Sequence, residues 1–288
     1  MMIYRILLIS LSFLFCSFLG FSQNSNAVKK RIDKLNKINT IKVAYHPLVV
    51  EQIFKFSKRK SFPKTMGLAK FYFPLFKAKL KLYNLPEELK YLTVVESNLK
   101  SVATSRVGAQ GLWQFMRTTG KQMGLYQNQH VDIFNDPVAS TDAACRYLKM
   151  LYGQLGNWEL ALAAYNCGIG RVQKLLRKTK GKTFWDIRAH LPKETQLYVP
   201  SFLAVQYLMN YYHNYNLKPY SLSIAFEDVK IIKAKRAISY ASLDFKSQRE
   251  RRIFKFLNPH IKNEYIPTGT YFYMDKNSSV VSNSLVLN

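Results

Sequence analysis

The sequence predicts a mainly α-helical protein that ends in a small segment of mixed α and β structure. Between residues 86 and 217, helix-start signals precede runs with helical periodicity, as at Pro86, at Asp136 and at Asn157. After residue 217 the pattern changes to short β-like runs at 221–226 and 229–232, followed by proline-containing turns. The helical zone alone is large enough to bury a core.

The N-terminal segment predicts export from the cytoplasm. Arg5 precedes an apolar run over residues 6–19, and small residues follow at the positions that a signal peptidase reads. We expect residues 1–22 to be a secretory signal peptide that is cleaved after Ser22, so that the protein acts in the periplasm or cell envelope. Lipid attachment at Cys16, or retention of the apolar run as a membrane anchor, is the alternative.

Prolines and capping residues divide the rest of the chain into three zones. We expect a helical lead-in over residues 23–85, a helical domain over 86–217 and an accessory segment over 218–288. Within the lead-in, Pro63 and Pro74 are expected to interrupt helices. Within the domain, we expect a helix over 138–151 and a last long helix that Pro200 opens, over 201–215.

Glu96 is the candidate catalytic acid of the helical domain. Pro86 suits a first helical position, and Leu89, Leu92 and Glu96 then share one face of the helix. That face is otherwise apolar, and burial raises the pKa of a carboxyl group. A glutamic acid that stays protonated near neutral pH can act as a general acid. The alternative is a structural Glu96 that pairs with a basic residue.

The residues after this acid are of types that bind sugars. A glycine-rich turn with Gly108 and Gly111 leads to Trp113, Gln114 and Met116. Aromatic and thioether side chains can cover the faces of sugar rings, and an amide can bind hydroxyl or N-acetyl groups. We therefore expect chemistry on a glycan. The alternative is that the glycines only permit a turn and that Trp113 and Met116 belong to the core.

Four sequence blocks in order make residues 86–212 resemble the catalytic domain of lytic transglycosylases, particularly of the membrane-bound D type. The blocks are VESN at 95–98, SRVGAQGLWQ at 105–114, AAYNCG at 163–168 and LPKETQLYV at 191–199. These lysozyme-like enzymes cut the glycan strands of peptidoglycan. The resemblance implies a lysozyme-like helical fold for the catalytic domain, residues 86–217.

The resemblance also implies roles for individual residues. Glu96 takes the place of the family's single catalytic acid and base, with Tyr165 and Asn166 lying over it. Contact with the substrate or the groove is implied for Ser105, Gln114, Met116, Tyr165, Asn166, Glu194 and Tyr198. The alternative for Asn166 is the capping of a helix end. Cys167 departs from the family pattern, which has a small residue there, and this departure concerns substrate preference more than activity.

The implied activity is cleavage of the β-1,4 bond between N-acetylmuramic acid (MurNAc) and N-acetylglucosamine (GlcNAc), with formation of 1,6-anhydro-MurNAc ends. Glu96 would act first as the acid and then as the base. Two other functions stay open, a goose-type lysozyme-like hydrolase of the same bond and an inactive glycan-binding protein of the wall. Intact Glu96, Tyr165 and Asn166 argue against the inactive protein.

Residues 218–288 do not indicate a function. Longer members of the family often carry small LysM glycan-binding modules in this region. The segment contains no complete LysM repeat and resembles only a degenerate one.

The formal net charge of +26 predicts an anionic partner. Because the lysines and arginines are spread along the sequence without a nucleic-acid-binding motif, we expect no nucleic acid partner. Peptidoglycan glycan strands, whose stem peptides carry carboxylates, and an anionic membrane surface both fit the charge. Solvated helix faces are the alternative.

We expect neither a cofactor nor a metal. The sequence contains no His or Cys cluster with the spacing of metal ligands, and no glycine-rich loop of the phosphate-binding kind. Cys145 and Cys167 would remain after removal of the signal peptide. Free thiols are favoured over a disulfide between them.

Overall fold

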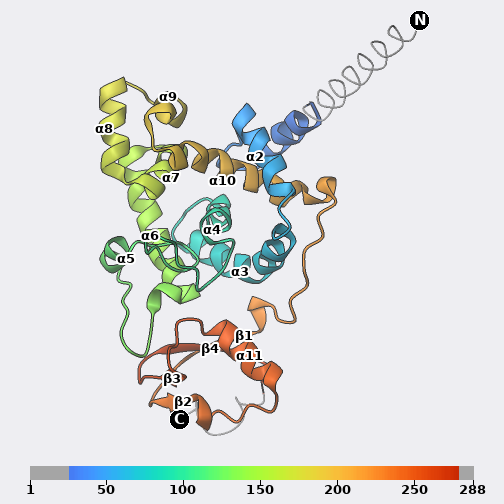
Figure 1. Cartoon of the computed structure of the whole chain (residues 1–288), viewed down its shortest axis with the longest axis vertical. Helices are drawn as coiled ribbons and strands as arrows, with labels where there is room; N and C mark the ends of the chain where they lie inside the picture. Colours follow the sequence, from blue (N-terminus) through green and yellow to red (C-terminus); the bar gives the residue numbers. More distant parts are fainter. Residues whose placement is uncertain (1–25, 279–288) are drawn as a thin grey trace, which may run out of the picture.

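The structure is a computed structural model that describes residues 26–278. The predicted signal peptide, with Cys16 and the cleavage site after Ser22, lies outside the described residues. Within the described part, no helix is both long and apolar enough to cross a membrane. The prediction of a mainly α-helical fold with a small mixed segment at the C-terminal end is confirmed (Figure 1).

The helices form one lobe with a common core. After a helical stretch over residues 26–36 it consists of α2 (Pro47–Ser57), α3 (Phe62–Leu82), α4 (Leu92–Ser97), α5 (Arg117–Gln122), α6 (Pro137–Leu155), α7 (Trp158–Cys167), α8 (Ile169–Thr179), α9 (Phe184–Ile187) and α10 (Lys193–Tyr211). Short 3-10 helices cover Glu87–Tyr91, Ile133–Asn135, Arg188–His190 and Tyr212–Tyr215. Figure 1 shows α4 in the middle of this lobe, with α3, α6 and α10 around it.

The N-terminal lead-in packs into the same core as the domain that follows it. Helix α2 lies along α10 and buries Val49, Ile53 and Phe56. The side chain of Gln206 on α10 donates a hydrogen bond of 2.7 Å to the carbonyl of Ile41, just before α2. The position of α2 beside α10 brings lead-in residues to the cavity described below.

Two of the predicted helix boundaries at prolines were wrong. Pro74 lies inside α3, and Pro200 lies inside α10, which begins earlier, at Lys193. Of these three prolines, Pro63 is the one that stands at a helix start. Large buried side chains such as Phe76 flank the internal prolines. This packing offsets the backbone hydrogen bond that a proline removes, and it cannot be read from local sequence.

The helix starts predicted at Asp136 and Asn157 are confirmed. The Asp136 carboxylate accepts hydrogen bonds from the backbone N–H groups of Val138 and Ala139, at 2.8 and 2.9 Å. The Asn157 side chain accepts one from the N–H of Leu160 at 3.0 Å. These bonds satisfy donors that the first turn of a helix leaves free. Helix α6 contains the whole of the predicted 138–151 segment.

The C-terminal lobe has a small core of its own. Strand β1 (Val229–Lys233) pairs antiparallel with β4 (Tyr271–Asp275), β2 (Ile238–Ser239) pairs with β3 (Tyr265–Ile266), and α11 (Gln248–Leu257) packs on β4. The 3-10 helices Phe226–Asp228 and Tyr240–Ser242 complete it. The strand predicted at 229–232 is confirmed as part of β1. The one predicted at 221–226 was wrong, because that largely exposed run connects the two lobes.

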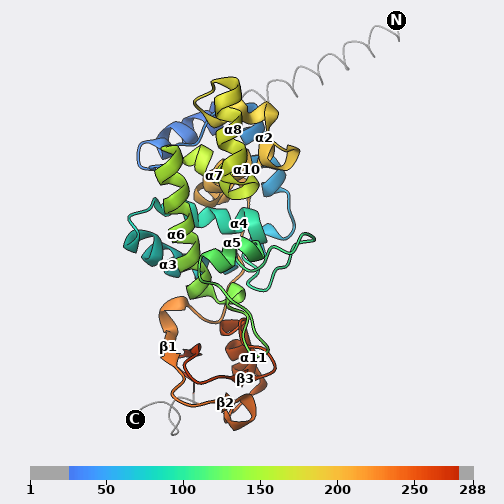
Figure 2. The same cartoon turned by 90° about the vertical axis from the view of Figure 1, so that its left-hand side faces the viewer.

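The loop between α5 and α6 joins the two lobes. It descends from the helical lobe to the strands, as both views show (Figures 1 and 2). The N–H of Asp132 donates to the carbonyl of His260 at 2.8 Å, and the N–H of Lys262 donates to the carbonyl of His130 at 2.7 Å. The C-terminal lobe therefore holds the segment that leads into α6.

Candidate active site

Glu96 is placed by the short helix α4 and the turn that follows it. The predicted helix after Pro86 is split, since a 3-10 helix over Glu87–Tyr91 precedes α4. Helix α4 is anchored in the core, and the hydroxyl of Ser97 donates a hydrogen bond of 2.8 Å to the carbonyl of Leu112. This bond ties the acid's helix to the far end of the glycine-rich turn.

The glycine-rich turn is braced by two of the predicted site residues. Gly111 has φ +78°, and a Cβ there would lie 2.1 Å from the Phe134 carbonyl oxygen, so only glycine fits without a shift. The amide nitrogen of Gln114 donates to the carbonyls of Ala103 and Gly111, at 3.0 and 2.9 Å. The hydroxyl of Ser105 accepts the N–H of Ala109 at 2.9 Å. Ser105 and Gln114 therefore shape the turn at the edge of the cavity.

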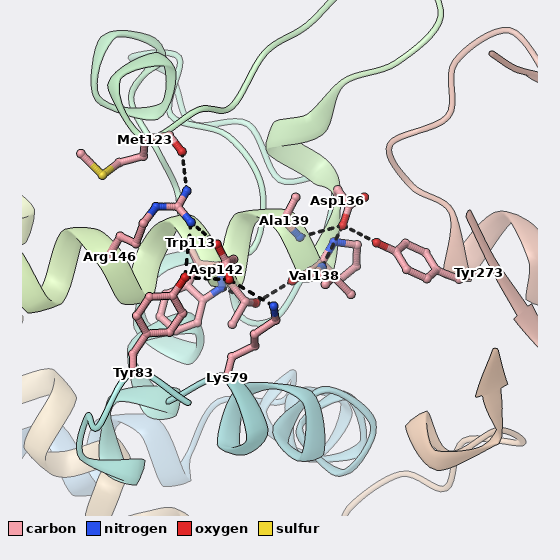
Figure 3. Close-up of polar contacts among 12 residues, drawn as sticks. Lys79, Tyr83, Trp113, Met123, Asp136, Val138, Ala139, Asp142, Arg146 and Tyr273 are labelled. Atoms are coloured by element: carbon pink, nitrogen blue, oxygen red, sulfur yellow. Dashed lines mark hydrogen bonds and ion pairs between the residues drawn. The ribbon is translucent and has the colours of Figure 1, made fainter. Parts of the chain in front are cut away.

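Trp113 is a core residue, and the expectation that it covers a sugar ring was wrong. Its side chain is 0% exposed and packs against Phe76, with ring centroids 5.3 Å apart. Its indole N–H donates to the Thr141 hydroxyl on α6 at 2.9 Å, so its polar atom is also satisfied (Figure 3). Met116, by contrast, is 46% exposed and faces the cavity.

The structure brings the sequence-predicted site residues to one cavity of about 520 Å³. Its lining includes Glu96, Ser105, Gln114, Met116, Tyr165, Asn166, Glu194 and Tyr198. These residues come from four separate stretches of the chain, which α4, the glycine-rich turn, α7 and α10 carry to the same place. A sugar-sized space with a carboxyl group and several polar side chains is the arrangement expected of a ligand site.

Helix α10 forms one wall of this cavity along a single face. Glu194, Leu197, Tyr198 and Ser201 follow the spacing i, i+3, i+4 and i+7, and all four line the cavity. With a rise of about 1.5 Å per residue, the face extends about 10 Å from Glu194 to Ser201. Leu197 and Ser201 were not predicted from the sequence, although their helical spacing relative to Glu194 and Tyr198 indicates the same face.

The environment of Glu96 keeps its carboxyl group protonated at neutral pH. Burial is the largest cause, and together with the negative charge of Glu194 it raises the pKa of Glu96 to about 8. The hydroxyl of Tyr198 donates a hydrogen bond to Oε1 and opposes this shift. Tyr198, which was expected only in the groove wall, is therefore the residue that contacts the acid directly.

Tyr165 and Asn166 lie near the acid but bond to other groups. The hydroxyl of Tyr165 donates to the carbonyl of Trp113 at 2.7 Å. Burial first, and then the nearby charge of Glu96, holds the pKa of Tyr165 well above its ordinary value. The Asn166 amide donates to Glu194 at 3.4 Å and accepts from the hydroxyl of Thr195 at 2.6 Å. Its side chain thus connects α7 to α10.

Neither the cysteines nor any group of metal-ligand side chains forms a second centre within the described residues. Cys145 and Cys167 are free thiols, as favoured from the sequence, with Cys145 buried and Cys167 partly exposed. Across residues 26–278 there is no group of three His, Cys, Asp or Glu side chains that could hold a metal ion.

Comparison with known proteins identifies the central part of the chain. The sequence model of the Transglycosylase SLT domain family matches residues 73–188. Membrane-bound lytic murein transglycosylase D of Escherichia coli (strain K12) is 37% identical over 174 residues, which cover 58% of this chain and 38% of that protein. The resemblance to lytic transglycosylases predicted from the four blocks is confirmed, and residues 73–188 are similar to the SLT domain.

Other similar proteins cover smaller parts. A putative tributyltin chloride resistance protein of Alteromonas sp. (strain M-1) is 34% identical over 100 residues, 34% of this chain and 48% of that one. The crystal structure of the 70 kDa soluble lytic transglycosylase from Escherichia coli is 28% identical and matches 49% of this chain and 24% of that chain, with a TM-score of 0.43. This chain therefore spans less than half the length of each of these relatives.

Proposed function

We propose that this protein is a peptidoglycan lytic transglycosylase that cleaves the β-1,4 bond between MurNAc and GlcNAc and leaves 1,6-anhydro-MurNAc ends. The observation that carries the proposal is Glu96, whose pKa is raised to about 8 in a cavity that polar and aromatic side chains also line. The SLT match over residues 73–188 supports the same activity. A relative named as a lytic murein transglycosylase also supports it.

In the first half of the reaction, protonated Glu96 acts as the general acid. It donates its proton to the glycosidic oxygen while the bond from that oxygen to C1 of the muramic sugar breaks. The carbonyl oxygen of the sugar's own 2-acetamido group supports the positive charge that develops at C1, in place of a second protein carboxylate. Because the Tyr198 hydroxyl engages Oε1, we assign the transferred proton to Oε2.

In the second half, the ionised Glu96 acts as the base. It takes the proton of the C6 hydroxyl while that oxygen attacks C1, and this step closes the 1,6-anhydro ring and restores the protonated acid. No water is consumed. The hydrogen bond from Tyr198 stabilises Glu96 while it is ionised between the two steps. An oriented internal hydroxyl has a large effective concentration, which favours ring closure over hydrolysis.

We further propose that the catalytic domain is residues 86–217, with α2 of the lead-in adding one wall, and that the protein acts in the cell envelope. Peptidoglycan is found there, and the Escherichia coli relative is named as membrane-bound. Export would use the signal peptide predicted at residues 1–22, and the net charge of +26 would favour contact with anionic strands. N-terminal sequencing of protein recovered from the envelope tests export. A mature chain that begins near Gln23 is expected, and a lipid-modified Cys16 would contradict it.

The products formed in ¹⁸O-labelled water test the reaction. Peptidoglycan digested by the protein should release fragments with unlabelled 1,6-anhydro ends, about 20 mass units lighter than ends hydrolysed by the labelled water, because no water enters the product. Mass spectrometry of the fragments gives the answer. Labelled reducing ends would make the protein a lysozyme-like hydrolase, and the absence of cleavage would leave only glycan binding.

A further inference from the structure

The lead-in helix α2 supplies one end of the cavity. Gln52, Lys55 and Phe56 on α2, and Arg59 just after it, all line the space that contains Glu96. These residues precede the segment 73–188 that matches the SLT family. They also lie outside the catalytic domain predicted over residues 86–217. Residues outside the SLT match therefore form part of the cavity wall.

Helix α10 shows where this end lies relative to the acid. Near its N-terminal end Glu194 bonds to Asn166, in the middle Tyr198 bonds to Glu96, and further along Ser201 donates to the Gln52 carbonyl oxygen at 3.5 Å. From the helical rise, Ser201 lies about 4.5 Å beyond Tyr198, while Glu194 lies about 6 Å before it. The α2 residues thus form the end of the groove opposite Glu194.

Gln52 presents an unused hydrogen-bond donor at this end. The residue is 2% exposed and lines the cavity, and its amide nitrogen has no hydrogen-bond partner among residues 26–278. A buried amide without a partner is costly, and native proteins rarely keep one without a reason. An oxygen atom of a bound ligand would satisfy it.

Two positively charged side chains, Lys55 and Arg59, line the cavity together with Gln52. Neither Lys55 nor Arg59 forms an ion pair with any residue in the described part of the chain. The guanidinium of Arg59 stacks on the Phe56 ring, 3.8 Å from its centroid, which restricts its direction. The groove consequently has a cationic end at α2 and an acidic end at Glu194. The cationic end attracts the negatively charged groups of a glycan strand, and the acidic end does not.

We propose that Gln52, Lys55 and Arg59 form a subsite for a carboxylate carried by the glycan strand. The inference rests on the proposed function, since it assumes that a muramic-acid-containing strand occupies the groove. Two sources offer the same chemistry, the lactyl carboxylate of a muramic sugar without its peptide and the carboxylates of an attached stem peptide. In either case the subsite binds the charged strand in preference to a neutral one and helps to set its register over Glu96.

Binding to the inactive Glu96→Gln protein tests the subsite without turnover. Three glycans of equal length are compared by calorimetry: a peptide-free GlcNAc–MurNAc oligomer, the same oligomer with its stem peptides, and a neutral chito-oligosaccharide. The oligomer that carries the recognised carboxylate should bind about 10-fold more tightly than the neutral one, and the difference should shrink as salt rises. Whichever of the two charged oligomers shows the difference identifies the source.

Matched variants separate the subsite from general charge. Lys55→Gln with Arg59→Gln should remove the preference for the charged oligomer and leave binding of the neutral one within about twofold. Lys58→Gln with Lys60→Gln removes the same charge from exposed residues outside the cavity and should keep the preference. If Arg59→Gln impairs folding, Lys55→Gln alone replaces the double variant, because the Lys55 side chain is exposed. It should remove part of the preference for the charged oligomer.

Two results would overturn the subsite. One is equal affinity for charged and neutral oligomers, and the other is an equal loss of the preference in both double variants. Either would show that α2 does not recognise a carboxylate. Either result is compatible with peptidoglycan cleavage by the unchanged protein, so the proposed function would stand. If no oligomer bound and no cleavage occurred, both proposals would fall together.

Discussion

Two carboxylates of this protein each accept a hydrogen bond from a tyrosine hydroxyl, yet their surroundings differ. Glu96 accepts from Tyr198 in the cavity of the helical lobe. Asp136 accepts from Tyr273 at 2.6 Å, where the C-terminal lobe meets the start of α6 (Figure 3). The pairs are chemically alike, so the difference lies in what else each carboxylate touches.

Asp136 is surrounded by donors. Besides Tyr273 it accepts two backbone N–H groups at the start of α6, and His260 lies 3.6 Å from its second oxygen. The residue is buried and its side chain links two lobes. Among residues 26–278, Tyr198 is the one donor to the Glu96 side chain, which otherwise faces the cavity. A carboxylate that accepts several hydrogen bonds holds structure together, while a desolvated one with a single donor can transfer a proton.

The largest expected effect is the loss of activity in Glu96→Gln. Glutamine keeps the shape of the side chain but has no transferable proton, so glycan release should fall about 10²–10⁴-fold. Release of soluble fragments from purified peptidoglycan measures it. The melting temperature should not fall, since the change removes a carboxyl that burial already disfavours in its charged form. Activity within a few-fold of the unchanged protein would exclude Glu96 as the acid.

Asp136→Ala should have the opposite profile, with a loss of stability and normal activity per folded molecule. The change removes a helix cap and leaves the buried Tyr273 hydroxyl without its acceptor, which together should lower the free energy of unfolding by about 2–4 kcal/mol. Urea unfolding measures the loss, and glycan release corrected for the folded fraction is the control. If corrected activity fell as steeply as in Glu96→Gln, the distinction between the two carboxylates would fail.

The sequence predicted this distinction only in part. Asp136 follows a local rule, because a cap bonds to residues two and three positions away, and the structure confirms it. The four blocks pointed to Glu96, Tyr165, Asn166 and Tyr198 through a resemblance. That Tyr198 bonds to the acid depends on how α10 crosses α4, which local sequence does not state.

The errors share one cause, which is packing between distant segments. Trp113 has an aromatic ring of the kind that can stack on a sugar, but α3 and α6 enclose it. Pro74 and Pro200 are local helix breakers, but the core holds their helices together. Gln52 and its neighbours reach the cavity because α2 packs along α10, a contact between residues far apart in the chain.

A matched pair of tyrosine variants sharpens the comparison. In Tyr198→Phe, loss of the hydrogen bond that favours ionised Glu96 should raise the pKa of Glu96 further and lower glycan release about 10-fold. In Tyr273→Phe, the free energy of unfolding should fall by about 1 kcal/mol with an unchanged pH profile of activity. The pH dependence of kcat/KM together with urea unfolding separates the two. A shifted pH profile in Tyr273→Phe would mean that the C-terminal lobe also influences the acid.

The smallest expected effect comes from Glu194→Gln, which also tests whether Glu96 acts alone. Activity requires protonated Glu96, so it should decline as the pH rises through about 8. The negative charge of Glu194 raises the pKa of Glu96, so its removal should move this alkaline limb to lower pH, by less than about one pH unit. Glutamine keeps an oxygen for the contact with Asn166, and the rate below pH 6 should therefore stay within about threefold. The pH profiles of kcat/KM for Glu194→Gln and Tyr198→Phe should show alkaline limbs that are displaced in opposite directions.

If Glu194→Gln instead abolished cleavage at every pH, two carboxylates would share the chemistry, as in most glycoside hydrolases. Glu96 would then not be the single acid and base.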